Sequence, residues 1–142
     1  MATLEQLLQN YRIFLCDDDA ITIDTMTYLL RQAGAKVFTS RTQTHNILKK
    51  CLESLPISLI LLDRDLGIHQ TGYTIFKEIR NNPQLAHIPV VLITGADPQF
   101  EIKQAQQSGI DGFIAKPVRV KTFAPMIYDI IQGKSVWYDG SL

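Results

Sequence analysis

Five short apolar runs recur along the chain at regular intervals, and they constrain its fold more than any other feature. The runs are RIFLC (12–16), AKVFT (35–39), ISLILL (57–62), PVVLI (89–93) and GFIA (112–115). The segments between them fit helices with one apolar face, as Ile23, Met26 and Leu30 illustrate. Apolar strands that alternate with amphipathic helices are typical of βα units around a parallel sheet covered on both faces. The sequence therefore predicts an α/β fold with a doubly wound sheet of five strands and five main helices.

Turn and capping residues predict where the helices and the domain begin and end. Gly34 follows the first helix, Asn81-Asn82-Pro83 ends the third, and Asp97-Pro98 begins the fourth. A short extra helix is expected near the N-terminus. At 142 residues the chain has the length of one domain with a substantial core. We expect an N-terminal extension at 1–10, one domain at 11–132 and a C-terminal tail at 133–142.

Charge and apolar content argue against several classes of partner. Lys plus Arg equals Asp plus Glu, at 14 each, so no general attraction to nucleic acid or to an anionic membrane is expected. No apolar run approaches the roughly 18 residues of a membrane span, and the N-terminus lacks a basic region followed by an apolar core. Cys16 and Cys51 are too few for a disulfide framework. We expect a cytoplasmic protein that binds its partners at local sites.

Polar side chains follow four of the five predicted strands. The first strand leads into Asp17 and Asp18, the third ends at Asp63, the fourth at Thr94 and the fifth at Lys116. In such sheets, ligands bind at the carboxyl ends of the strands, near the point where the strand order reverses. We therefore expect three carboxylates, a hydroxyl and an ammonium group at one edge of the sheet.

These residue types suit phosphoryl transfer to a carboxylate. Crowded carboxylates ionise together only when a cation or hydrogen-bond donors compensate them, and Mg²⁺ prefers oxygen ligands, so Asp17 and Asp18 are candidate metal ligands. Asp63 is the candidate nucleophile, because a carboxylate can form an aspartyl phosphate. Lys116 could stabilise charge on the transferred group, and Thr94 could donate its hydroxyl to a phosphoryl oxygen.

The motifs LCDDD, LILLD, VVLITG and GFIAKP occur in this order, and with them the chain resembles the receiver domains of two-component response regulators over residues 11–132. The resemblance implies a flavodoxin-like receiver fold with strand order 2-1-3-4-5 and phosphorylation of Asp63 with Mg²⁺. It implies that Asp63 and the backbone carbonyl of Asp65 join the metal ligands. It also implies that Thr94 and Phe113 are switch residues. A plain core position on the fifth strand is the alternative for Phe113.

The resemblance also implies the partners. The phosphoryl donor would be a histidine kinase or a phosphotransfer protein, and a downstream protein target would bind the surface of the fourth helix, fifth strand and fifth helix. Direct nucleic-acid or membrane binding is not expected, and homodimer formation on phosphorylation is compatible with this function. The protein would be no enzyme in the usual sense, since it would catalyse only its own phosphorylation and slow dephosphorylation.

The loop after Asp63 departs from the family pattern. The family has Met-Pro and then Gly there, whereas this chain reads DRDLGIHQTG, with Gly67 in place of the proline and one more residue. Asp65 stands where a side chain influences phosphate lifetime in the family. The sequence therefore leaves open the geometry of residues 66–71 and the kinase contacts there.

Two other functions fit part of the sequence. The DxD of LILLDRDLG resembles the first motif of haloacid-dehalogenase-like phosphatases, but the acidic pair lies before it, whereas that family has its metal-binding acids after it. A pseudo-receiver that binds partners without being phosphorylated is the second alternative, although Asp63 and Lys116 are both present. A nucleotide-binding domain is disfavoured, because no strand is followed by GxGxxG or GxxxxGK[ST].

Overall fold

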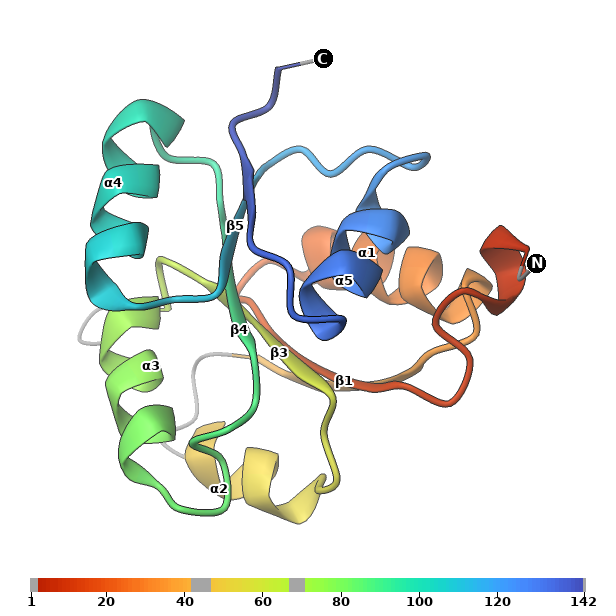
Figure 1. Ribbon diagram of the computed structural model, residues 1–142. Coiled ribbons are helices and arrows are strands. Elements are labelled where there is room, and N and C mark those ends of the chain that lie inside the picture. The colour runs from red at the N-terminus through yellow and green to blue at the C-terminus, as the bar shows by residue number, and fades with distance from the viewer. Residues whose placement is uncertain (1–2, 42–46, 67–70, 142) are drawn as a thin grey trace.

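The computed structural model describes residues 3–41, 47–66 and 71–141, and its elements follow the predicted alternation (Figure 1). A 3-10 helix, η1 (Leu4–Gln6), begins the chain. The strands are β1 (Arg12–Cys16), β2 (Lys36–Ser40), β3 (Leu59–Asp63), β4 (Val90–Thr94), β5 (Gly112–Ala115) and β6 (Val136–Tyr138). The helices are α1 (Ala20–Gln32), α2 (Ile47–Glu53), α3 (Gly72–Asn81), α4 (Pro98–Ser108) and α5 (Phe123–Ile131).

Within these described ranges, six strands form one parallel sheet of order β2-β1-β3-β4-β5-β6. The first five positions confirm the flavodoxin-like order 2-1-3-4-5. The register pairs Cys16 with Leu62, Asp63 with Ile93, and Thr94 with Ala115. Strands β1, β3, β4 and β5 therefore end at the same edge of the sheet, which places the predicted site there.

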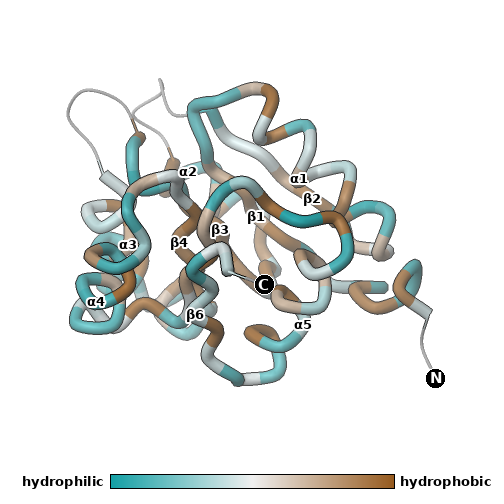
Figure 2. Tube along the Cα trace, turned by 90° about the horizontal axis from the view of Figure 1, so that it is seen from above, coloured by the Kyte–Doolittle hydropathy of each residue, from teal (hydrophilic) through white to brown (hydrophobic). Residues whose placement is uncertain are grey.

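Two helical layers cover the sheet. Helices α1 and α5 lie on one face, and α2, α3 and α4 lie on the other (Figure 1). The central strands β3 and β4 are buried at every residue, and Figure 2 shows their apolar colouring beneath helices of mixed polarity. The predicted apolar face of α1 is confirmed, since Ile23, Met26 and Leu30 are buried. Among the described residues, no helix is long and apolar enough to cross a membrane.

Local capping explains where the helices begin and end. Asp19 caps α1, where its side chain accepts hydrogen bonds from the Ile21 N–H and the Thr22 hydroxyl. Asp97 caps α4 by accepting the Gln99 N–H, with Pro98 in the first turn as predicted. Gly34 follows α1 with a φ of +96°, a left-handed conformation that favours glycine.

The C-terminal segment differs from the predicted tail. Residues 136–138 form β6, which pairs with β5 so that Trp137 lies opposite Phe113 and Tyr138 opposite Ile114. Trp137 packs against the core on the α2–α4 side, and Tyr138 against the core on the α1–α5 side. The prediction of five strands is therefore short by one, because a three-residue strand between GKS and DGS shows no periodicity that sequence reasoning can detect.

The short helix expected near the N-terminus is a three-residue 3-10 helix. The 3-10 helix occupies Leu4–Gln6, and the segment after it is anchored by Leu8, which is fully buried and donates its N–H to the Ala33 carbonyl. The extension therefore packs beside the end of α1.

Candidate functional site

Three carboxylates meet at the carboxyl ends of β1 and β3. Asp17 is fully buried, Asp63 is 5% exposed, and Asp18 faces solvent. One carboxylate oxygen from each of the three lies within 4.8 Å of the others. The structure thus brings together the acidic residues that the strand-end pattern predicted to be neighbours.

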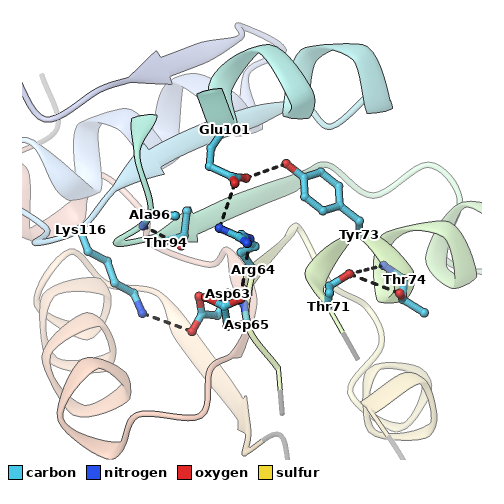
Figure 3. Close-up of polar contacts among 10 residues, drawn as sticks. All are labelled: Asp63, Arg64, Asp65, Thr71, Tyr73, Thr74, Thr94, Ala96, Glu101 and Lys116. Carbon is cyan, nitrogen blue, oxygen red and sulfur yellow. Dashed lines mark hydrogen bonds and ion pairs between the residues drawn. The ribbon is translucent and has the colours of Figure 1, made fainter. Parts of the chain in front are cut away.

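Lys116 supplies the positive charge that this cluster requires. Its Nζ lies 2.9 Å from Asp17 Oδ2. It also lies 3.4 Å from Asp63 Oδ2 (Figure 3). The ammonium is within ion-pair distance of Asp17 Oδ2, but this buried oxygen accepts no aligned hydrogen bond. The other oxygen, Asp17 Oδ1, accepts the Asp19 N–H at 2.9 Å. Asp17 Oδ2 is therefore left with unused acceptor capacity inside the cluster.

The ionisation of Asp63 reflects this surplus of negative charge. Burial and the neighbouring Asp17 raise the pKa of Asp63 from 3.8 to about 7, while Lys116 and the Asp65 N–H oppose the rise. Burial lowers the pKa of Lys116, but contacts with Asp17 and Asp63 outweigh that effect, and the net shift is upward. The cluster therefore favours a bound cation in addition to the ammonium.

The donor set fits magnesium. Asp17, Asp18 and Asp63 offer hard oxygen ligands close together, and Asp17 Oδ2 has acceptor capacity to spare. Mg²⁺ is commonly held by one or two carboxylates together with waters and phosphate oxygens. Because Asp18 is exposed, the site is open to solvent on one side.

Thr94 ends β4 beside this cluster. It is 1% exposed, and its hydroxyl accepts the Ala96 N–H at 3.2 Å (Figure 3). Its carbonyl accepts the Lys116 N–H at 2.9 Å. In this state the Thr94 hydroxyl therefore orders the β4–α4 loop. Phe113 is fully buried in the core on the α2–α4 side, as its interpretation as a core residue expects.

The turn after Asp63 is held by backbone hydrogen bonds. Asp63 Oδ1 accepts the Asp65 N–H at 3.4 Å, and the Arg64 carbonyl accepts the Gly72 N–H at 2.7 Å. The Asp65 side chain is 67% exposed and lies 3.7 Å from Arg64 Nε. Gly67, the residue found where the family has proline, lies outside the described residues.

Gly72 allows α3 to begin directly against this turn. A Cβ atom there would lie 2.5 Å from the Asp63 carbonyl oxygen and 2.8 Å from Leu92 Cδ1. Both distances are shorter than real Cβ contacts, so a side chain would push α3 away from the strand end. The close approach of α3 to the end of β3 and to Leu92 of β4 therefore explains why glycine occupies position 72.

Sequence reasoning missed a second polar cluster beside the site. The Glu101 carboxylate on α4 is 4% exposed, lies 2.9 Å from Arg64 Nη1, and accepts a hydrogen bond from the Tyr73 hydroxyl at 3.2 Å (Figure 3). Burial and Glu101 raise the pKa of Tyr73 to about 12. Phe100, the largest apolar residue of α4, is 68% exposed and does not anchor this helix. One feature of the sequence could have indicated this cluster: Arg64, a charged residue that directly follows the most apolar strand.

Known proteins identify the family. The response regulator receiver domain family matches residues 13–128. The chain belongs to this family. Among curated relatives, this receiver is 27% identical over 108 residues to the two-component response regulator ORR6 of Oryza sativa subsp. japonica, covering 75% of this chain and 63% of the relative. It is 24% identical over 119 residues to chemotaxis protein CheV1 of Helicobacter pylori, covering 82% and 37% respectively. The chain therefore spans less than two thirds of the length of both relatives.

Solved structures show the same fold. A putative response regulator from Chloroflexus aurantiacus aligns with a TM-score of 0.77 at 21% identity, covering 86% of this chain and 98% of that one. A response regulator from Desulfuromonas acetoxidans aligns with a TM-score of 0.76 at 22% identity, covering 86% and 97%. At these identities the likeness establishes the fold alone. The family assignment leaves the haloacid-dehalogenase alternative without support.

Proposed function

We propose that this receiver accepts a phosphoryl group on Asp63 from a histidine kinase or a phosphotransfer protein. The observation that carries the proposal is the placement of the buried Asp63 carboxylate beside Asp17, Asp18 and the Lys116 ammonium. Family membership supports it, because receivers are signalling modules of two-component systems. In the transfer, the bond from phosphorus to the donor imidazole nitrogen breaks, and a bond from phosphorus to an Asp63 oxygen forms.

Each residue of the site has a defined part in this reaction. Asp63 provides the attacking oxygen, and its ionised form is the competent one. Asp17, Asp18 and Asp63, with the backbone carbonyl of Asp65, would hold Mg²⁺. When bound, this ion neutralises charge on the phosphoryl oxygens and favours ionised Asp63. Lys116, 3.4 Å from Asp63 Oδ2, stabilises the added negative charge.

The output of phosphorylation would be a change at the surface on the α4 side. Thr94 lies at the site, and its hydroxyl can exchange the Ala96 N–H for a phosphoryl oxygen. Phe113 would then fill space next to Thr94, which is the proposed switch. Because β6 pairs with β5, a downstream protein would meet α4 and β6 rather than an open β5 edge. Homodimer formation on phosphorylation would use the same side, and a cytoplasmic location suits these partners.

The test is phosphorylation by acetyl phosphate with Mg²⁺, followed by intact-mass measurement. The wild type should gain one phosphoryl group, and Asp63→Ala should gain none. Asp65→Asn is the matched control, because it alters a neighbouring carboxylate whose side chain is exposed, and it should still gain the group. Equal gain in Asp63→Ala would disprove the assignment. No gain in the wild type would favour the pseudo-receiver alternative.

A further inference from the structure

Polar contacts contribute more than usual to the attachment of α4. The buried residues of this fully described helix are Glu101 and Ala105, while Ile102 is partly buried against the core. Phe100, its largest apolar residue, faces solvent. Alanine buries little area, so the contacts of the Glu101 carboxylate are a main determinant of where α4 sits.

The Glu101 carboxylate depends on two partners. One oxygen pairs with Arg64 Nη1 at 2.9 Å, and the other accepts the Tyr73 hydroxyl at 3.2 Å. A buried carboxylate that loses its counter-charge is strongly destabilised, because its desolvation is no longer compensated. If Arg64 moves away, α4 must shift until Glu101 reaches water or another donor. Arg64 is free to move outward, since its side chain is 37% exposed.

Arg64 is also part of the turn that the Asp63 side chain organises. Asp63 Oδ1 accepts the Asp65 N–H at 3.4 Å, a contact that encloses Arg64 between its two ends. Phosphorylation adds a bulky substituent and about one further negative charge to this carboxylate. The acceptor of the Asp65 N–H changes, and the turn that carries Arg64 must adjust.

We propose that Arg64 is a positioning residue that links Asp63 to α4 through the Glu101 carboxylate. The proposal rests on phosphorylation of Asp63. It adds a route distinct from Thr94, because it runs along the β3–α3 turn rather than the β4–α4 loop. The coupling is reciprocal by thermodynamic linkage. If a phosphoryl group at the site changes the affinity of α4 for a partner by some factor, binding of that partner changes the affinity of the site for a phosphoryl group by the same factor.

The test compares amide exchange over residues 98–108 with and without beryllofluoride, a phosphoryl mimic, in the presence of Mg²⁺. The decisive variant is Arg64→Met combined with Glu101→Gln, which removes both charges and so leaves no unpaired buried ion. Tyr73→Phe is the matched control, because it removes the other hydrogen bond to Glu101 and keeps the ion pair. Arg64→Lys retains the charge and should retain part of the response.

We expect beryllofluoride to change wild-type exchange over α4 by about threefold or more, a local opening effect. The double variant should still bind beryllofluoride, as exchange near Asp63 reports, while its α4 response falls to less than about half. Tyr73→Phe should respond like the wild type. If the double variant responds fully, the ion pair is structural only and the link is wrong.

Failure of the proposed function gives a different result. A wild type that neither binds beryllofluoride nor gains phosphate from acetyl phosphate overturns the function and the link together. If the double variant does not fold, Arg64→Lys decides the matter. A wild-type response in that variant, with unchanged exchange in its free state, contradicts the link, because the link requires the contact of the Arg64 guanidinium with Glu101. A reduced response supports the link.

Discussion

Replacing Asp63 with asparagine should stabilise this receiver in the absence of magnesium, and by more at pH 8 than at pH 5. Asp63 is 5% exposed, and burial beside Asp17 raises its pKa from 3.8 to about 7. Because the folded pKa is above the unfolded one, the folded state binds more protons between these values. The stability that protonated Asp63 contributes is complete below about pH 4 and is lost as the pH rises through about 7.

The magnitude follows from the two pKa values. Each unit of separation corresponds to about 1.4 kcal/mol, so ionisation of Asp63 costs about 2 kcal/mol at pH 5 and about 4 kcal/mol at pH 8. Asparagine has a similar shape and no charge to desolvate, and Lys116 keeps Asp17 as its partner in the variant. The stability difference between variant and wild type should therefore grow by about 2 kcal/mol over this pH range.

Urea unfolding at both pH values with a chelator present measures this difference, and Trp137, the single tryptophan, gives the fluorescence signal. Thr94→Ala is the control, because it alters a buried polar residue of the same site without removing an ionisable group. The unfolding free energy of Thr94→Ala should differ from that of the wild type by the same amount at both pH values. If the difference in unfolding free energy between Asp63→Asn and the wild type stays constant or shrinks at pH 8, the reasoning is refuted. Adding magnesium at pH 8 should reduce the difference between Asp63→Asn and the wild type, because the cation favours ionised Asp63 in the wild type.

Three further predictions concern single side chains. Lys116→Ala should bind Mg²⁺ at least as tightly as the wild type, because the variant lacks a cation 3.4 Å from Asp63, yet it should respond poorly to beryllofluoride. Weaker Mg²⁺ binding by the folded variant, measured by titration, would contradict this prediction. Thr94→Ala should still gain phosphate by mass but lose most of the beryllofluoride-dependent amide exchange over residues 95–115, and a full response would exclude Thr94 as a coupling residue. Trp137→Ala should lower the free energy of unfolding in urea by about 2 kcal/mol, since Trp137 is partly buried against the core. Circular dichroism follows this unfolding because the variant has no tryptophan, and a change within experimental error would mean that β6 adds no stability.

Much of this receiver could be predicted because its signals are local in the sequence. Each central strand is an apolar run of four or five residues, and helices α1, α3 and α5 each have a repeating apolar face. Alternation of the two implies parallel strands whose carboxyl ends share one edge. Asp17, Asp63 and Lys116 directly follow or end such strands, so their convergence follows from the order of elements alone.

Tertiary structure decided what depends on residues far apart in the chain. Strand β6 exists because Val136–Tyr138 pairs with residues more than 20 positions earlier, and three residues are too few to carry a pattern. Glu101 is buried because Arg64 and Tyr73 reach it from other elements, although glutamate on a helix of low hydrophobicity is usually exposed. The raised pKa of Asp63 likewise depends on burial and on Asp17, which follows a different strand, β1. Propensity and periodicity act within a few residues, whereas desolvation and charge pairing act between whatever side chains the fold brings into contact.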